Sequence, residues 1–289
     1  MESIKIIADS TCDLNEELLE RYQITMIPLC VIMGEDTYQD GINISPKEIY
    51  EWSEKENSTP KTAAPLLNEV IDILKPLIEQ HQEIIYIGIS EEMSSTCNVV
   101  RLASEILDYD AIHIINSKNL STGIGLQVLK AASMAMEGKT ANYIVSYITG
   151  TMQELVKASF VVDTLTYLYR GGRCSSVTAL IGNTFLLKPM IVVKNGKMGV
   201  GKKYRGNTRK VLLNYVADML EELKKADKER VFITHSGCDE GIITLIYDYI
   251  KKLNIFHEIH ITRAGGVISS HCGPKTLGVL YVGSASGTK

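Results

Sequence analysis

Strand-like and helix-like segments alternate through the first half of the chain, and this alternation limits the fold more than any other feature. Short apolar runs rich in β-branched residues are each followed by a polar loop and then by apolar residues at helical spacing. The predicted strands are residues 4–8, 84–89 and 111–115, and the predicted helices include residues 15–22, 68–80 and 123–137. Alternation of this kind predicts an α/β domain with a parallel sheet covered by helices on both faces.

The second half has a different pattern. Residues 186–204 read as two strands joined by the turn Asn195-Gly196, which is a strong signal for a hairpin. Strand and helix patterns also follow one another further along the chain, so we predict a mixed sheet here. The expected division is an N-terminal parallel-sheet domain, residues 1–158, and a C-terminal mixed-sheet domain, residues 159–289.

Three segment assignments bear on the site. We expect residues 25–33 to form one strand, irregular or at a sheet edge because it contains Pro28. Residues 140–158 have the spacing of one helix, and residues 267–276 have the composition of a loop.

The segment 83–107 predicts a ligand-binding loop. Its strand is followed by Ser94, Ser95 and Thr96 and then by a helix. In a parallel sheet this loop lies at the carboxyl end of the strand, where open α/β folds bind ligands. Hydroxyl donors beside a helix N-terminus suit a carboxylate or a phosphate. The alternative is that Ser94 or Ser95 only caps the helix.

Two other segments offer polar groups. Thr62 lies between Pro60 and Pro65 in a break that cannot continue a helix. His271 lies in a glycine-containing stretch and is a candidate for hydrogen bonding to an anion, although a loop-stabilising histidine is the plainer alternative. The adjacent Cys272 would point away from His271 on an extended chain, which argues against thiol catalysis. We expect no metal site, because the spacing of His235, Cys238, His271 and Cys272 matches no zinc pattern.

The charged motifs are less specific. Asp9 and Asp13 lie in one polar turn, where they either bind a cation or shape the turn, and the second role is the more common. The segment Arg170–Arg173 contains two glycines and offers an arginine for a carboxylate across the domain cleft. Residues 202–205 form a short basic patch that is expected to be solvated, and a docking surface for an acidic partner is the alternative. The chain has no G-x-x-x-x-G-K-[ST], G-x-G-x-x-G or G-x-S-x-G motif.

Composition excludes several classes of protein. The net charge is −4 and the pI is about 5.9, which gives no indication of nucleic-acid binding. The six cysteines are scattered without a C-x-x-C motif, as expected for free thiols in a reducing compartment. No apolar run is long enough for a transmembrane helix, and the first residues lack a signal-peptide pattern. We therefore predict a cytoplasmic protein.

The motifs of this chain, taken in order, resemble those of the DegV family of bacterial fatty-acid-binding proteins. They extend over nearly the whole chain: Asp9-Ser10-Thr11-Cys12-Asp13, Pro60-Lys61-Thr62, Met93-Ser94-Ser95-Thr96, Gly171-Gly172-Arg173 and His271-Cys272-Gly273-Pro274. The chain also departs from the usual family pattern. Ala63-Ala64 stands where the family often has Ser-Gln, Ser95 where it commonly has glycine, and Lys275 where glycine is usual.

The resemblance implies a two-domain α/β protein that holds one long-chain fatty acid between its domains. It implies that Thr62, Ser94 and Ser95 meet the carboxylate, with His271 and Arg205 nearby. Supporting loops would contain Asp9, Ser10, Thr96, Arg173 and Gly273.

The resemblance also implies a partner and a pathway. A separate ATP-dependent fatty acid kinase would phosphorylate the bound carboxylate, giving acyl phosphate for phospholipid synthesis. This chain would be a carrier without a catalytic nucleophile, metal or cofactor, and without integral association with a membrane. Two alternatives stay open: an enzyme, either phosphotransferase or hydrolase, acting on a small anionic metabolite, and a regulatory module that senses a ligand.

Overall fold

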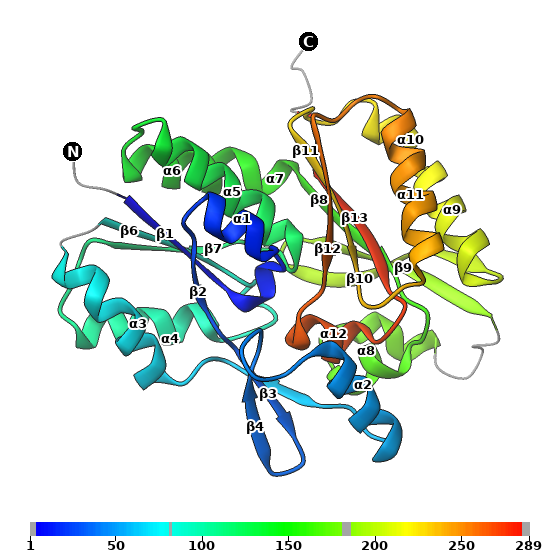
Figure 1. Cartoon of the computed structure of the whole chain (residues 1–289), viewed down its shortest axis with the longest axis horizontal. Helices are drawn as coiled ribbons and strands as arrows, with labels where there is room; N and C mark the ends of the chain where they lie inside the picture. Colours follow the sequence, from blue (N-terminus) through cyan, green and yellow to red (C-terminus); the bar gives the residue numbers. More distant parts are fainter. Residues whose placement is uncertain (1–3, 81–82, 181–185, 285–289) are drawn as a thin grey trace.

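The structure is a computed structural model that describes residues 4–80, 83–180 and 186–284 (Figure 1). Its first sheet has four strands in the order β2-β1-β6-β7, and all neighbouring strands are parallel. These strands are β1 (Ile4–Asp9), β2 (Thr25–Ile27), β6 (Glu83–Gly88) and β7 (Ile112–Asn116). The predicted parallel sheet of the first half is therefore confirmed.

Alternate residues of these strands face two different helical layers. Ile7, Ile84 and Tyr86 pack against α3 (Leu67–Glu79) and α4 (Thr96–Ile106). Ile6, Ile85 and Ile87 belong to a core on the other face, with α1 (Glu16–Arg21), α5 (Thr122–Met136) and α6 (Ala141–Tyr147). Both faces of a parallel sheet must be covered, which explains why the central residues of β1 and β6 are apolar on both faces.

The second sheet has six strands in the order β10-β9-β8-β13-β11-β12. Its strands are β8 (Val156–Val161), β9 (Leu187–Lys194), β10 (Lys197–Arg205), β11 (Arg230–His235), β12 (Glu258–Arg263) and β13 (Leu277–Val282). β11 and β12 are parallel, and the other neighbouring pairs are antiparallel. The mixed sheet is therefore confirmed, and so is the β9–β10 hairpin with its Asn195-Gly196 turn.

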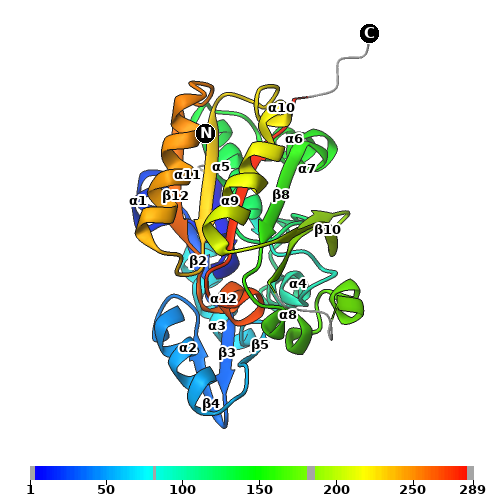
Figure 2. The same ribbon diagram turned by 90° about the vertical axis from the view of Figure 1, so that its right-hand side faces the viewer.

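Helix α5 joins the two sheets into one core. Eleven of its residues are buried, and it contacts β1 and β6 of the parallel sheet as well as β8 and β13 of the mixed sheet. A helix that is apolar on all sides is stable only when it is surrounded by protein. The outer face of the mixed sheet is covered instead by α9 (Thr208–Asp218), α10 (Leu220–Leu223) and α11 (Glu240–Lys252) (Figure 2).

A small antiparallel sheet lies below these layers in Figures 1 and 2. Its strand order is β4-β3-β5, with β3 (Cys30–Met33), β4 (Asp36–Gln39) and β5 (Lys61–Ala63). It packs against α2 (Pro46–Lys55) and α12 (Gly266–Cys272) around the buried side chains of Val31, Ile49 and Val267. This sheet carries Thr62 on β5, and α12 carries His271.

Three segment predictions were wrong. Residues 25–33 are not one strand, since Pro28 and Leu29 separate β2 from β3 and the two belong to different sheets. The predicted helix 140–158 is interrupted, because α6 continues as a π-helix, η2 (Ile148–Met152), and as α7 (Gln153–Leu155) before β8 begins. The predicted loop 267–276 is mostly α12. The division after residue 158 stays a prediction and would fall inside β8.

Three short elements complete the chain that the structure describes, namely η1 (Ser10–Cys12), α8 (Thr166–Gly171) and η3 (Ser175–Leu180).

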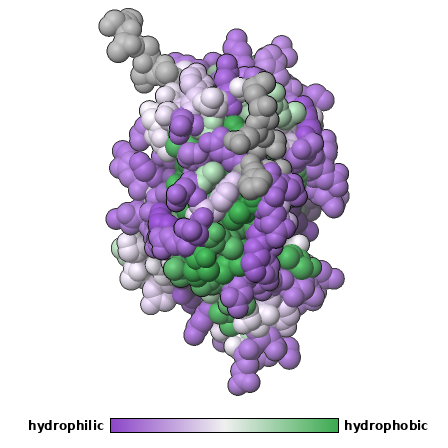
Figure 3. Space-filling view, turned by 90° about the vertical axis from the view of Figure 1, so that its left-hand side faces the viewer, coloured by the Kyte–Doolittle hydropathy of each residue, from purple (hydrophilic) through white to green (hydrophobic). Residues whose placement is uncertain are grey.

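Hydrophobic surface gathers in the middle of the face on which the strands of the parallel sheet begin (Figure 3). This face lies opposite the loops at the carboxyl ends of those strands. Among the described residues no helix combines the length and apolar character needed to cross a bilayer.

Candidate functional site

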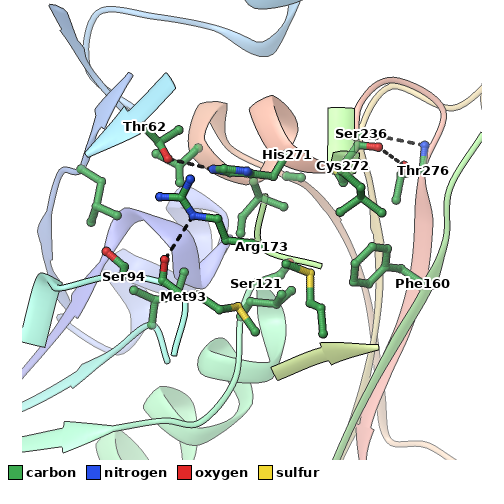
Figure 4. Close-up of a pocket in the computed structure, with 18 of the residues that line it drawn as sticks. Thr62, Met93, Ser94, Ser121, Phe160, Arg173, Ser236, His271, Cys272 and Thr276 are labelled. Atoms are coloured by element: carbon green, nitrogen blue, oxygen red, sulfur yellow. Dashed lines mark hydrogen bonds between the residues drawn. The ribbon is translucent and has the colours of Figure 1, made fainter. Parts of the chain in front are cut away.

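A cavity of about 260 Å³ lies where the loops of the parallel sheet meet the mixed sheet and α12 (Figure 4). Its walls are mainly apolar. The buried apolar lining includes Leu29, Ile89, Met93, Leu120, Phe160, Leu168, Val267 and Leu280. One group of hydroxyl, imidazole and guanidinium side chains lies opposite Phe160 in Figure 4, whereas Ser236 and Thr276 lie on the same side as Phe160. The group opposite Phe160 consists of Thr62, Ser94, Ser95, Arg173 and His271.

Thr62 and His271 form the centre of this polar group. Thr62 is fixed by the pairing of β5 with β3, in which it lies opposite Val31. Its Oγ1 is 2.8 Å from Nε2 of His271. Burial, together with the nearby charge of Arg173, lowers the pKa of His271 to about 4. The imidazole is therefore neutral near pH 7 and shares a single hydrogen bond with the Thr62 hydroxyl.

Gly171, the last residue of α8, and Gly172, which follows it, allow the backbone to lie against His271. A Cβ on Gly171 would lie 2.3 Å from Nδ1 of the imidazole, so only glycine fits beside the ring. Nδ1 is buried and has no hydrogen-bond partner in the described part of the chain. Gly172 ends α8 with φ of 68°, in the left-handed region that glycine adopts readily. The Arg170–Arg173 motif thus shapes the wall behind His271.

The predicted anion loop lies on the same cavity. Ser94 and Ser95 both line it, and Ser94 Oγ is 2.8 Å from Thr96 Oγ1. Ser95 occupies the N-cap position of α4, but its side chain accepts no backbone N–H. The simple capping alternative therefore does not account for these serines, and their hydroxyls stay available beside the first turn of α4.

Arg173 supplies the positive charge of the site. Its Nη1 donates to the Gly171 carbonyl at 2.9 Å, and its Nε lies 3.5 Å from the Met93 carbonyl. Among the described residues Arg173 has no carboxylate partner, so the expected ion pair across the cleft is not formed within the protein. Arg173 and Ser95 are exposed to solvent, which makes this polar group the open end of the cavity.

The other predicted site residues lie outside the cavity lining. Arg205 is an exposed residue at the end of β10 and is not among the lining residues. Thr96 is buried beneath Ser94, and Gly273 ends α12 with φ of 73°. Ser10 is buried, and its Oγ accepts the Leu29 N–H at 3.1 Å.

Asp9 shapes the turn, since its Oδ1 accepts the Thr11 N–H at 3.1 Å, whereas the hydrogen bonds of Asp13 reach out of the turn to Gly265 and Ser121. Asp9 is buried and accepts hydrogen bonds from the Ile89 N–H at 2.8 Å and the Tyr86 hydroxyl at 2.9 Å. It therefore ties the end of β1 to the start of the ligand loop. No group of three His, Cys, Asp or Glu side chains in the described residues is arranged to hold a metal ion.

Several lining residues could not be chosen from the sequence, since core and cavity walls have the same apolar composition. They include Leu29, Leu120, Phe160, Met198, Ile268 and Leu280. The cysteines near the site are poor nucleophiles, because burial raises the pKa of the Cys272 and Cys238 thiols to about 12. The arrangement is suited to holding one acidic group at its polar end and an apolar body behind it.

Comparison with known proteins bears on the identity of the chain. A family model described as "Uncharacterised protein, DegV family" matches residues 3–284. The chain belongs to the DegV family. A DegV domain-containing protein of Clostridium perfringens is 33% identical over 282 residues, which cover 98% of this chain and 99% of that protein. The family resemblance drawn from the motifs is confirmed.

Solved DegV structures share the fold. The structure of DegV from Bacillus subtilis, described as a fatty acid binding protein, has 28% sequence identity and a TM-score of 0.85, and the match covers 98% of this chain and 100% of that one. A protein from Eubacterium ventriosum, described as binding stearic acid, has 26% identity and a TM-score of 0.84, with 96% and 98% coverage.

Proposed function

We propose that this DegV protein binds one long-chain fatty acid, with the acyl chain in the apolar cavity and the carboxylate at the polar end. The observation that carries the proposal is that Thr62 and Ser94, from separate segments, line one cavity together with Arg173 and His271. The structurally similar proteins described as binding a fatty acid or stearic acid support it.

The physical chemistry of the cavity agrees with this ligand. Each CH₂ group moved from water into an apolar site contributes about 0.8 kcal/mol, so a long acyl chain can supply most of the affinity. The carboxylate must keep hydrogen-bond partners when it leaves water. Hydroxyl donors, a neutral imidazole and a guanidinium meet that need, and hydrogen bonds to charged groups are the stronger kind.

We further propose that the carboxylate is presented to a separate ATP-dependent fatty acid kinase in the cytoplasm, which forms acyl phosphate for phospholipid synthesis. The exposed positions of Ser95 and Arg173 support this, since they place the polar end of the cavity where a second protein can reach it. In this scheme the chain acts as a carrier that contributes no nucleophile or cofactor. Arg205 lies outside the cavity lining, and its expected place near the carboxylate stays a prediction.

The first experiment identifies the ligand. Gently purified protein is denatured, extracted with solvent and analysed by mass spectrometry, with a long-chain fatty acid as the expected finding. Repeated absence of any acyl ligand, together with no binding of added fatty acid, would rule out the proposal. Turnover of a small anionic metabolite by the isolated chain would favour the enzyme alternative.

The second experiment tests the head-group contacts. Thr62→Ala and Ser94→Ala, alone and together, are compared with Thr37→Ala and Ser146→Ala, which remove exposed hydroxyls outside the lining. A hydrogen bond to a charged group contributes about 1.5–3 kcal/mol, so each site variant should bind fatty acid at least about tenfold more weakly. Unchanged affinity in the double variant, with the fold intact, would remove the proposed carboxylate site.

A further inference from the structure

The amino end of α12 is held by side chains from the far end of the chain. The N-cap residue, Gly265, has no side chain with which to cap the helix. Its N–H donates to Asp13 Oδ1 at 2.8 Å, and the Gly266 N–H donates to Asp40 Oδ1 at 2.5 Å. Backbone N–H groups at a helix start have no partner within the helix, so two carboxyls distant in sequence provide this cap.

The glycines allow these carboxyls to come close. A Cβ on Gly266 would lie 2.9 Å from Asp40 Oδ1 and 3.0 Å from Ile49 Cδ1. A Cβ on Gly265 would lie 3.1 Å from Asp40 Oδ1. Asp13 and Asp40 are buried. The contact is therefore a tight fit between two carboxyls and a side-chain-free stretch of backbone, and it leaves the helix start little freedom to move.

Asp13 also reaches the cavity wall. Its Oδ2 accepts a hydrogen bond from the Ser121 hydroxyl, and Ser121 lines the cavity. Ser121 has φ of 52°, a backbone conformation that residues other than glycine adopt infrequently. One carboxyl thus links a residue of the cavity wall to the start of the helix that carries His271.

We infer that Asp13 and Asp40 are positioning residues for the head-group site. Because His271 comes five residues after the clamped Gly266, at a rise of about 1.5 Å per residue, it lies roughly 8 Å further along the axis of α12. At the other end, Gly171 lies against the imidazole ring. The two carboxyls therefore fix the position from which His271 reaches Thr62, although neither lines the cavity.

The same contacts explain why the opening motif ends in Asp13. Asp9 holds the ligand loop through Ile89, whereas Asp13 holds α12 through Gly265. One turn of chain thus sets the relative positions of two segments that carry head-group residues. The effect on ligand binding rests on the proposed function, but the effect on His271 does not require a ligand.

The test uses Asp13→Ala and Asp40→Ala in the full chain, with Ile250→Val as the control. Ile250 is buried in the separate core of the mixed sheet, so its variant loses stability without touching α12. In ligand-free protein, ¹⁵N and ¹H NMR signals of the His271 imidazole should shift in both alanine variants and stay unchanged in the control. Fatty-acid affinity should fall about two- to tenfold beyond any loss in the control, the size expected when one neutral hydrogen bond is lost.

Two further variants make the outcome decisive. Asp13→Asn keeps an oxygen that can accept the Gly265 N–H and should restore most of the affinity and the His271 signals. If an alanine variant does not fold, Gly266→Ala provides the second perturbation, because its methyl group displaces Asp40 Oδ1 while both carboxyls remain.

Unshifted His271 signals in folded alanine variants, or an affinity loss no greater than that of Ile250→Val, would overturn the inference. Failure of the wild type to bind any fatty acid would instead refute the proposed function, since the NMR comparison is made without ligand.

Discussion

Gly171→Ala provides the sharpest test of how His271 is held. The added Cβ would lie 2.3 Å from Nδ1 and 3.2 Å from Cε1 of the His271 ring, so the ring or the backbone must shift. Forcing an extra carbon into a packed site costs about 1–3 kcal/mol. Because Gly171 lies within α8, the better helix propensity of alanine returns at most about 1 kcal/mol. The two effects leave a net loss between about 0 and 3 kcal/mol, with about 1–2 kcal/mol as the central expectation.

This loss can be measured by thermal unfolding. At about 2.1 cal/mol/K per residue, a chain of 289 residues has an unfolding entropy of roughly 0.6 kcal/mol/K, so 1–2 kcal/mol corresponds to a fall in Tm of about 2–3 °C. Displacing the ring also breaks the 2.8 Å contact with Thr62. A neutral hydrogen bond contributes about 0.5–1.5 kcal/mol, so fatty-acid affinity should fall by roughly two- to tenfold.

Gly150→Ala is the matched control. Gly150 lies in the helical segment η2, and a Cβ added there would have no neighbouring atom within 4 Å, so alanine should be neutral or stabilising by up to about 1 kcal/mol. Calorimetry and fatty-acid titration are run on the two variants in parallel. A Gly171→Ala protein with wild-type Tm and wild-type affinity would show that the ring has room to move and that the glycine does not set its position.

Three other predictions follow from the buried groups. Burial raises the pKa of Asp13 to about 8, far above the value of about 4 in an unfolded chain. Its contribution to the unfolding free energy is therefore complete below pH 4 and is lost as the pH rises through 8. In urea titrations at pH 5 and pH 8, the wild type should lose unfolding free energy relative to Asp13→Asn. Burial lowers the pKa of His271 to about 4, whereas the pKa in an unfolded chain is near 6.5. Its contribution to folding stability is therefore complete above pH 6.5 and is lost as the pH falls through 4. The NMR signals of its imidazole should not titrate between pH 8 and 5.5. Phe160→Ala enlarges the cavity and should shift the acyl chains recovered by mass spectrometry towards longer or bulkier ones, with a loss of stability near the lower end of about 3–5 kcal/mol; an unchanged lipid profile would show that Phe160 does not limit the ligand.

The sequence predicts the layered fold well because its signals are local. Strand β6 is an unbroken apolar run, and the helices around it have regular apolar spacing, so both can be recognised from a short window of residues. The β9–β10 hairpin is equally clear, since Asn195-Gly196 suits a tight turn whatever surrounds it.

The errors have causes that lie far away in the chain. The segment that contains α12 begins with two glycines and reads as a loop, because its cap comes from Asp13 and Asp40. Residues 25–33 are apolar throughout, and only the tertiary structure shows that β2 and β3 belong to different sheets. Local propensity cannot show a partner more than two hundred positions away.

The candidate site shows the same division. Thr62 and Ser94 can be selected from their loops and from the family motifs, and the structure places both on one cavity. Arg205 was selected in the same way but lies outside the lining. Phe160 and Leu280 are buried strand residues like their neighbours, so their position on the cavity wall becomes visible only when the mixed sheet is assembled.

The strand order of the mixed sheet has a consequence for folding during translation. β13 comes last among the described strands, yet it lies between β8 and β11. During translation no strand pairs with both the β8–β9–β10 group and the β11–β12 pair until residues 277–282 have left the ribosome. Gly278 and Leu280 on that strand are also part of the cavity wall. A nascent chain that lacks β13 therefore has an incomplete cavity wall. A ligand can be enclosed only after this strand has been synthesised.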